Sequence, residues 1–178
     1  GQFNPQGKLT VSFPRTVGQV PIFYNHKNTG RPEGFYESVF ITKYLDSPKQ
    51  PLFPFGYGLS YTTFEYSEIQ MEDKQLTRDG KLNVSVKVKN TGKYKGTETV
   101  QLYIRDLVAS VTRPVKELKS FRKVELKPGE EKKVEFVITE KDLRFWNDKK
   151  QFISEPGKFH LFIGTDSENV KKAEFVLL

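Results

Sequence analysis

Acidic side chains that could act as a catalytic pair are rare in the first third of the chain. The acids there are Glu33, Glu37 and Asp46. Glu33 and Glu37 are four residues apart, a spacing that would place both carboxylates on one face of a helix, where they could support acid/base hydrolysis. Gly34 and the nearby Pro32 disfavour a helix at this point, so we interpret the pair as part of a solvated loop. The sequence therefore predicts no catalytic residue in this chain.

Other common chemistries lack the residues that they need. The chain has no cysteine, which excludes disulfides and thiolate ligands, and its two histidines, His26 and His160, are far apart. This argues against a metal site, and we expect no metal and no cofactor. No serine lies in a G-x-S-x-G elbow and no glycine-rich phosphate loop is present. No run of 18 apolar residues occurs, so we expect no membrane span.

The charge of the chain is spread along its length. The net charge is +7 over 178 residues, of which +3 falls on residues 1–61 and +4 on residues 62–178. The densest basic run lies around Lys116–Lys127, where Phe121, the aromatic inside it, is expected in the core. A nucleic-acid site would gather its basic residues beside exposed aromatic ones, so we expect a solvated surface and no nucleic-acid partner.

An aromatic stretch, Pro51–Tyr61, divides the chain into two unequal parts. It reads P-L-F-P-F-G-Y-G-L-S-Y, and its prolines exclude a helix interior or a central strand. Aromatic rings in an irregular segment need a surface to pack against, which flexible linkers do not offer. We therefore expect an ordered connector that is held between two packed bodies.

The part before the connector has too few regular elements to enclose a core. Residues 1–61 contain 12 of the 24 aromatic residues and 7 of the 10 prolines. Alternating apolar residues predict a short strand over Leu9–Phe13, and Val20–Tyr24 is typical of an edge or extended segment because it contains a proline. Residues 33–50 show no period and are interpreted as a long loop.

The part after the connector has the pattern of an antiparallel β-sandwich. Apolar residues alternate clearly over Leu82–Val88, and Val100–Ile104 is expected to be its antiparallel partner. Further strands are predicted near Phe64–Ile69 and within Val115–Leu126, and then at Val134–Ile138, Phe159–Ile163 and Ala173–Leu178. About seven short strands separated by Pro, Gly and Asn turns favour two domains: residues 1–61, and a sandwich over residues 62–178.

Two aromatic residues, Tyr103 and Trp146, bear on whether the sandwich binds a sugar. Tyr103 lies on the polar side of its strand, so it is expected to be exposed and is the best candidate for stacking on a sugar. Trp146 could add to such a platform, but a sandwich of this type commonly buries one tryptophan, and we expect Trp146 in the core with Leu143 and Phe145.

Thr139–Asp142 is expected to form a single capped helical turn.

Several motifs together resemble the C-terminal portion of family 3 glycoside hydrolases of the bacterial periplasmic β-glucosidase type. They occur in order along the whole chain. They are N-P-Q-G-K-L-T-V-S-F-P-R at Asn4–Arg15, G-Q-V-P-I-F-Y-N-H-K at Gly18–Lys27, T-G-R-P at Thr29–Pro32, the F-G-Y-G-L-S-Y block of the connector, R-P-V-K-E-L-K at Arg113–Lys119 and F-H-L-F-I-G at Phe159–Gly164.

The resemblance implies a non-catalytic fragment of a larger enzyme. Members of the family have an N-terminal barrel with a nucleophilic aspartate in an S-D-W-type motif, an α/β sandwich domain with the general acid/base glutamate, and a fibronectin type III-like domain. No Ser-Asp-Trp occurs here. The chain would therefore be the terminal strands and loops of the α/β domain followed by the fibronectin type III-like sandwich. It would brace the upstream catalytic domains of a retaining, exo-acting enzyme that hydrolyses oligo- or aryl-glycosides in the periplasm or after secretion.

One difference from the family concerns the loop before the connector. Relatives often carry S-R-Y-x-D where this chain has Thr42–Asp46, and a lysine in place of arginine loses planar two-point recognition. The resemblance implies that this loop approaches the rim of the active site. The candidate rim residues are His26, Arg31, Tyr44 and Asp46. A free-standing carbohydrate-binding or adhesive sandwich is the alternative function.

Overall fold

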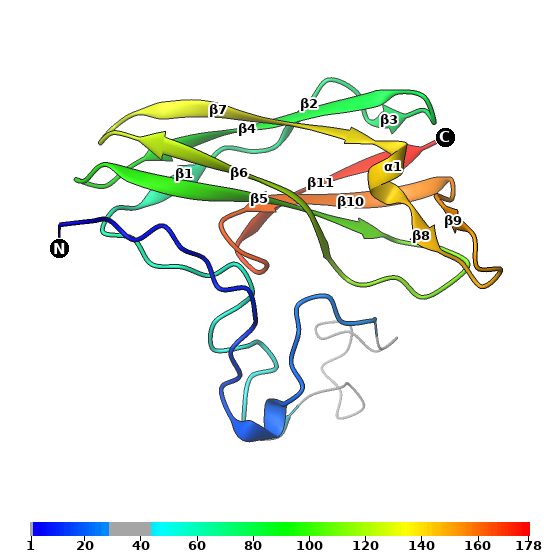
Figure 1. Cartoon of the computed structure of the whole chain (residues 1–178), viewed down its shortest axis with the longest axis horizontal. Helices are drawn as coiled ribbons and strands as arrows, with labels where there is room; N and C mark the ends of the chain where they lie inside the picture. The colour runs from blue at the N-terminus through cyan, green and yellow to red at the C-terminus, as the bar shows by residue number, and fades with distance from the viewer. Residues whose placement is uncertain (1, 29–43) are drawn as a thin grey trace.

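The computed structural model describes residues 2–28 and 44–178, and within them β-strands predominate (Figure 1). The strands are β1 (Phe64–Tyr66), β2 (Gln70–Met71), β3 (Gln75–Leu76), β4 (Lys81–Asn90), β5 (Gly96–Asp106), β6 (Glu117–Leu126), β7 (Glu131–Thr139), β8 (Phe145–Trp146), β9 (Phe152–Ile153), β10 (Gly157–Gly164) and β11 (Val170–Leu177). A 3-10 turn, η1 (Val17–Gln19), and a short helix, α1 (Glu140–Leu143), complete the elements.

Two sheets form the sandwich. In one, β4 pairs with β7 along one edge and with β1 and β2 along the other. The second has the order β3-β11-β10-β5-β6, in which β3 and β11 are parallel and the other pairs are antiparallel. This confirms the antiparallel sandwich that the alternating pattern predicts.

The apolar residues that alternate along the strands meet between the two sheets. The core contains Leu82, Val84, Val86 and Val88 from β4 and Phe159, Leu161 and Ile163 from β10, together with residues of β5, β7 and β11. Phe159 and Phe175 stack at the centre with ring centroids 5.3 Å apart. All members of this cluster come from residues 76–177, so the sandwich encloses its core without help from the N-terminal residues.

The pairing of β4 with β5 is a prediction that the structure overturns. The two strands follow one another in sequence but belong to different sheets, because the turn after β4 carries the chain from one sheet to the other. Asn90 holds this crossing: its Nδ2 donates to the carbonyl oxygens of Tyr94 and Leu126, and its Oδ1 accepts from Thr62 Oγ1 at 2.6 Å. The turn residues therefore serve a sheet-to-sheet connection and not a hairpin.

The expected strand over Leu9–Phe13 is also wrong, since its backbone pairs with the connector at separated points only. Leu9 N donates to Tyr57 O and Gly56 N donates to Leu9 O, both at 2.8 Å. Phe13 forms an isolated antiparallel bridge with Phe53. We call this pairing of Leu9–Phe13 with Phe53–Tyr57 the stem. Without a third strand beside it, the stem does not extend into a regular ladder.

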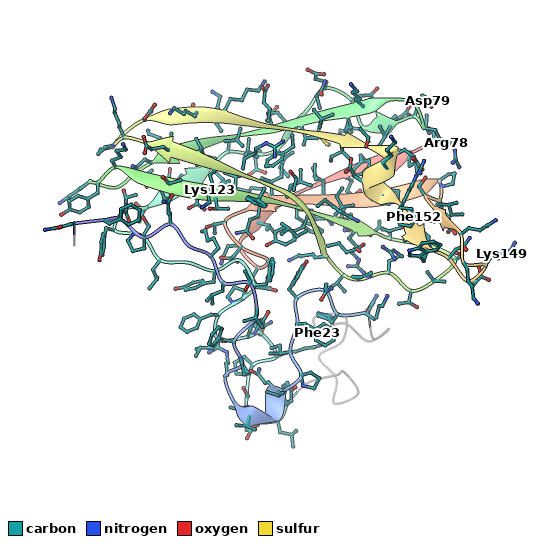
Figure 2. The ribbon with its side chains drawn as sticks, viewed as in Figure 1. Phe23, Arg78, Asp79, Lys123, Lys149 and Phe152 are labelled. Atoms are coloured by element: carbon teal, nitrogen blue, oxygen red, sulfur yellow. The ribbon has the colours of Figure 1, made fainter. Side chains whose placement is uncertain are left out.

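The N-terminal segment, defined here as residues 2–28 and 44–61, lies against one face of the five-stranded sheet and extends away from it (Figure 1). Ser167 N donates to Phe55 O at 2.9 Å, and Val115 N donates to His26 O at 2.9 Å. The connector is thus ordered, as its aromatic content predicts. Figure 2 shows Phe23 in this segment, well away from the strands of the sandwich.

Two aromatic residues that were expected in the core lie on the surface. Trp146 is 65% exposed and Phe121 is 54% exposed, whereas Leu143 and Phe145 are buried as predicted. Trp146 packs on Phe152 across the small β8–β9 sheet, with ring centroids 5.4 Å apart. Phe145 precedes it in the same strand, and successive side chains of a strand point to opposite faces, so only one of the two can enter the core.

Candidate functional site

A groove lies where the N-terminal segment meets the five-stranded sheet. It has a volume of about 640 Å³, and we call it the rim groove. Its walls come from residues 12–28, residues 44–51, the end of β5, the two residues before β6 and the turn between β10 and β11. Its lining includes Phe23, Tyr24, His26, Tyr44, Arg105, Lys116 and Ser167. The groove therefore combines aromatic rings with four cationic side chains, which are Lys27, Lys49, Arg105 and Lys116.

The structure brings together two of the four predicted rim residues. His26 and Tyr44 both line the rim groove although they are far apart in sequence, and both are exposed. Asp46 is exposed but does not line the groove. Arg31 lies outside the described residues, as do Glu33 and Glu37.

His26 is held by its backbone more than by its ring. Val115 N donates to His26 O, and the neighbouring Lys27 forms an isolated bridge with Pro114. Lys27 Nζ also donates to Thr112 O at 2.6 Å. Within the described part of the chain, the imidazole makes one hydrogen-bond contact, between Nδ1 and Lys27 O at 3.0 Å. The Nε2 edge of the ring is thus available in the groove to a hydrogen-bonding ligand.

Lys116 is a partly buried cation of the rim groove. Its Nζ donates to Ser167 O and lies 5.1 Å from the centre of the Phe162 ring. Burial lowers the pKa of Lys116 because a charged ammonium loses hydration there, while the nearby Glu168 opposes this effect. The ammonium group is occupied by a backbone carbonyl and a ring, so its first role is to fix the loop that contains Ser167.

Aromatic contacts join the N-terminal segment to β5. Tyr24 stacks on Phe55 with centroids 4.2 Å apart and meets Tyr103 edge-on at 5.8 Å. Tyr103 Oη donates to Gln101 Oε1 at 2.5 Å, and burial raises the pKa of Tyr103. Tyr103 is fully buried, so the expected exposed sugar platform at this residue is wrong. The outer face of β5 is covered by the N-terminal segment.

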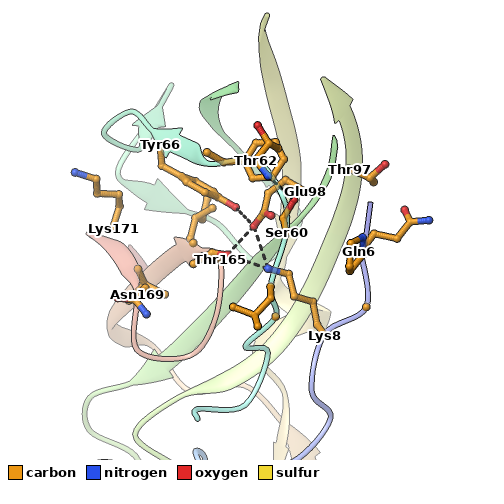
Figure 3. A pocket seen from close by; sticks show the side chains of 18 residues that line it. Gln6, Lys8, Ser60, Thr62, Tyr66, Thr97, Glu98, Thr165, Asn169 and Lys171 are labelled. Atoms are coloured by element: carbon orange, nitrogen blue, oxygen red, sulfur yellow. Dashed lines mark hydrogen bonds and ion pairs between the residues drawn. The ribbon is translucent and has the colours of Figure 1, made fainter. Parts of the chain in front are cut away.

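A second cavity of about 560 Å³ lies on the other side of the stem, and we call it the Glu98 pocket (Figure 3). Its walls come from residues 5–8, residues 58–66, the start of β5 and the turn between β10 and β11. Glu98 projects from β5 into this space and is 4% exposed. Three side chains donate to its Oε1 atom: Lys8 at 3.3 Å, Tyr66 at 2.9 Å and Thr165 at 2.7 Å.

This network closes on itself and ties the first residues of the chain to the sandwich. Lys8 Nζ also donates to Thr165 Oγ1 at 2.9 Å, and the Lys8 side chain is 15% exposed. Burial, reinforced by the Glu98 charge, raises the pKa of Tyr66, so this phenol remains a donor. A buried ion pair is stable when hydrogen bonds satisfy both partners, and here each partner has at least one more polar contact.

Among the residues that the structure describes, neither cavity is lined by a pair of carboxylates. Paired carboxylates that face one another across a bond are required for glycoside hydrolysis, and Glu98 instead faces the Lys8 ammonium. Among the described residues, no group of three or more His, Cys, Asp or Glu side chains could hold a metal ion. In the same part of the chain, no helix is long and apolar enough to cross a membrane.

Sequence reasoning missed Glu98 and Gln101, two buried polar side chains of β5 that attach the N-terminal segment to the sandwich by hydrogen bonds. Gln101 Nε2 donates to Gly56 O at 3.1 Å and to Thr165 O at 2.6 Å. The sequence does carry a sign of these two residues. The run T-E-T-V-Q at Thr97–Gln101 places polar residues on both faces of a strand that is otherwise apolar. A strand of that kind needs polar partners on its outer face as well as a core on its inner face.

Comparison with known proteins places this geometry in a protein class. Residues 98–167 match the fibronectin type III-like domain family. The chain is 50% identical, over its whole length, to the protein named periplasmic beta-glucosidase of Salmonella typhimurium, and 44% identical to beta-glucosidase BoGH3A of Bacteroides ovatus. A crystal structure of beta-glucosidase from Listeria innocua in complex with isofagomine superposes on 98% of the chain with a TM-score of 0.91 and 44% identity.

The sandwich is therefore a fibronectin type III-like domain of the kind found in glycosidases. The chain spans 23% of the Salmonella protein, 24% of the Bacteroides protein and 25% of the Listeria chain. The whole chain is therefore similar to a part of these beta-glucosidases, in agreement with the motifs, which resemble the C-terminal portion of family 3 glycoside hydrolases.

Proposed function

We propose that this chain is the non-catalytic C-terminal part of an exo-acting, retaining glycosidase of the β-glucosidase type. In this proposal, residues 62–178 form a complete fibronectin type III-like domain. Residues 1–61 complete an α/β domain that lies upstream. The sandwich braces the catalytic domains by holding the connector in place, and the chain alone hydrolyses nothing. By analogy with the Salmonella protein, which is named periplasmic, the parent protein would act in the periplasm or after secretion.

The observation that carries the proposal is the exposed apolar surface of the N-terminal segment. Twelve of the twenty large hydrophobic side chains that are exposed in the structure lie in residues 3–61, although this segment supplies well under half of the described chain. Leu45 is 99% exposed, Val17 is 88% exposed and Phe3 is 69% exposed. Many exposed apolar residues gathered in one segment are typical of an interface. An upstream domain of the same polypeptide would cover them.

The rim groove supports a second part of the proposal, which concerns substrate. His26 and Tyr44 share the groove, and Arg31 and Asp46 belong to the same stretch of sequence. We assign these four residues to the rim of the parent's active site, where they would contact an oligo- or aryl-glycoside beyond the sugar that is cleaved. Side chains at such a position contribute to binding of substrate more than to the chemical step.

A chimera tests the bracing role. The C-terminal portion of the Salmonella beta-glucosidase is replaced by this chain, which is 50% identical to it, and hydrolysis of an aryl β-glucoside is measured. We expect the chimera to be active. Phe13→Asp together with Phe53→Asp should abolish activity and soluble assembly, because both rings belong to the exposed surface. Phe121→Asp is the matched control on the exposed face of the sandwich and should keep the activity.

Two results would contradict the proposal. One is turnover of the aryl glucoside by the purified 178-residue chain. The other is an inactive chimera that is nonetheless soluble and folded by circular dichroism. For the rim, His26→Ala and Tyr44→Ala in the active chimera should raise KM with little change in kcat, whereas unchanged KM in both variants would remove these residues from the rim.

A further inference from the structure

The Glu98 pocket has an unused acceptor at its base. All three donors to Glu98 converge on Oε1, and no donor in the described part of the chain reaches Oε2. Glu98 is 4% exposed, and it lines the pocket. Among the described side chains, the fully buried polar atoms without a partner belong to Thr99, Asp106, Arg113 and Ser167, so Glu98 Oε2 keeps some exposure to the pocket and can accept a hydrogen bond there. The pocket therefore presents one strong acceptor to whatever fills it.

Lys8 supplies the complementary donor. Its ammonium group has three N–H bonds, two of which go to Glu98 and Thr165. The third is available on the side of the pocket, since Lys8 lines it. An acceptor and a donor thus lie side by side, joined by the 3.3 Å contact between Lys8 Nζ and Glu98 Oε1.

The charges of this pair restrict the class of ligand. An anion would meet the Glu98 carboxylate, and a cation would meet the Lys8 ammonium, so neither is favoured. A neutral group that both donates and accepts satisfies both partners. Two hydroxyls on adjacent carbons do this: one donates to Glu98 Oε2 while the other, or the same oxygen, accepts from Lys8.

The remaining walls fit the carbon skeleton of such a ligand. Figure 3 shows Tyr66 and Thr62 on one side of Glu98, and Thr165 and Asn169 on another. The lining also includes the Phe64 ring and apolar side chains. Aromatic rings pack well against the C–H faces of a sugar, and a volume of about 560 Å³ admits a six-membered ring with its hydroxyls.

We propose that the Glu98 pocket binds a neutral polyol with vicinal hydroxyls, of the size of a monosaccharide. The site lies on the junction between stem and sandwich and is separate from the rim groove. It does not depend on the proposed bracing role, because its lining residues are all present in this chain.

Titration of the 178-residue chain with methyl β-D-glucoside tests the proposal. Dissociation constants of order 1–10 mM are expected for so small a neutral ligand. Amide shifts in a two-dimensional NMR spectrum should concentrate at Thr97, Glu98, Gly164 and Thr165. Ethanol, which has one hydroxyl, and sodium sulfate, which is anionic, should produce no saturable shifts at these residues. Shifts that are absent, or that map to another face, would overturn the proposal.

Glu98→Gln gives the sharper test. It replaces the acceptor Oε2 by a donor or leaves a weaker acceptor, and should weaken binding about tenfold or more. Trp146→Ala is the matched control, since Trp146 is an exposed ring of the sandwich that does not line the pocket and to which a sugar could stack, and it should leave the affinity unchanged. Loss of binding in Trp146→Ala with retention in Glu98→Gln would overturn the assignment. If Glu98→Gln fails to fold, the NMR map of the unmodified chain decides.

Discussion

The sandwich and the N-terminal segment solve the problem of burying apolar side chains in opposite ways. In the sandwich, alternation along β4, β7 and β10 sends every second residue inward, and the core cluster is complete within residues 76–177. In the N-terminal segment, Phe13, Phe23 and Phe53 remain 37–50% exposed. The aromatic-rich segment is fixed by hydrogen bonds and stacked rings at a few points, and not by a core of its own.

The difference shows that order and self-sufficiency are separate properties. The connector is ordered because polar contacts such as Gln101 to Gly56 hold its backbone, yet its rings need a further surface. Hydrogen bonds fix a position at a net gain of about 1 kcal/mol each, whereas burial of rings supplies most of the stability of a domain. The two regions should therefore respond differently to the same kind of substitution.

The largest difference is expected for removal of an aromatic ring. Phe159→Ala should lower the free energy of unfolding by about 3–5 kcal/mol, since Phe159 is 1% exposed and its removal leaves a cavity against Phe175. Phe23→Ala should change it by less than ~1 kcal/mol, because Phe23 is 50% exposed. Urea unfolding measures both. Equal effects would mean that the segment shares the core of the sandwich.

A methyl group at Gly56 should detach the connector. Gly56 has a φ of +81°, and a Cβ there would overlap Gln101 Oε1, so Gly56→Ala should cost about 1–3 kcal/mol in attachment of the segment. Hydrogen exchange at the amides of Gly56 and Ser167 reports this. Gly7→Ala is the control, since nothing lies within 4 Å of a Cβ there. Unchanged protection in Gly56→Ala would show that Gln101 moves aside.

Loss of the Lys8 ammonium should loosen the start of the chain by a smaller amount. Lys8→Met keeps most of the side-chain volume but leaves Glu98 with two of its three donors, at a cost of about 1–2 kcal/mol. Limited proteolysis near residues 5–8 should become faster, while urea unfolding of the sandwich changes little. Lys171→Met, at a more exposed ion pair with Glu68, is the control and should show neither effect.

The smallest effect is a pH dependence that belongs to the sandwich. Burial raises the pKa of Asp106 from 3.8 to about 6, against an opposing hydrogen bond from Val108. An acid whose pKa is higher in the folded state stabilises the fold below its unfolded pKa, and this stability is lost as the pH rises through the folded value. The loss should fall between about pH 4 and 6 and amount to ~2 kcal/mol or less.

Asp106→Asn should remove this pH dependence while keeping the acceptor for Val108 N. Thermal unfolding at pH 4 and pH 7 measures the change in both proteins. The variant should be more stable than the unmodified chain at pH 7. A pH profile that is unchanged in Asp106→Asn would show that another group titrates, and would end the assignment to this carboxyl.

The sandwich could be predicted because the pattern that identifies each strand lies within a few consecutive residues. Apolar residues alternate strictly over Leu82–Val88 and in β7, which is enough to assign the inner faces of these strands, whereas β10 alternates only as far as Leu161 because Phe162 is also buried. Tyr103 failed the same test because β5 is covered on both faces, on one of them by Tyr24 and Phe55. Alternating apolar residues indicate that one face of a strand is buried, but they do not show whether the opposite face is covered as well.

The cavities could not be predicted from pattern because their contacts are distant in sequence. Lys8 meets Glu98 across 90 residues, and Thr165 meets it across 67. His26 and Tyr44 became candidates through resemblance to a family and not through spacing. Propensity and periodicity act over a few residues, so a site assembled from three remote segments leaves only indirect signs, such as the polar residues within β5.

The stem brings the two ends of the stretch between Phe13 and Phe53 close together. Phe13 and Phe53 are bridged, so everything between them departs from one place on the molecule and returns to it. The entropy of closing such a loop grows slowly, by about 0.6 kcal/mol for each doubling of its length. The same stem could therefore close a stretch of different length, but a replacement would also have to reproduce the contacts that Tyr24, His26 and Lys27 make with the sandwich.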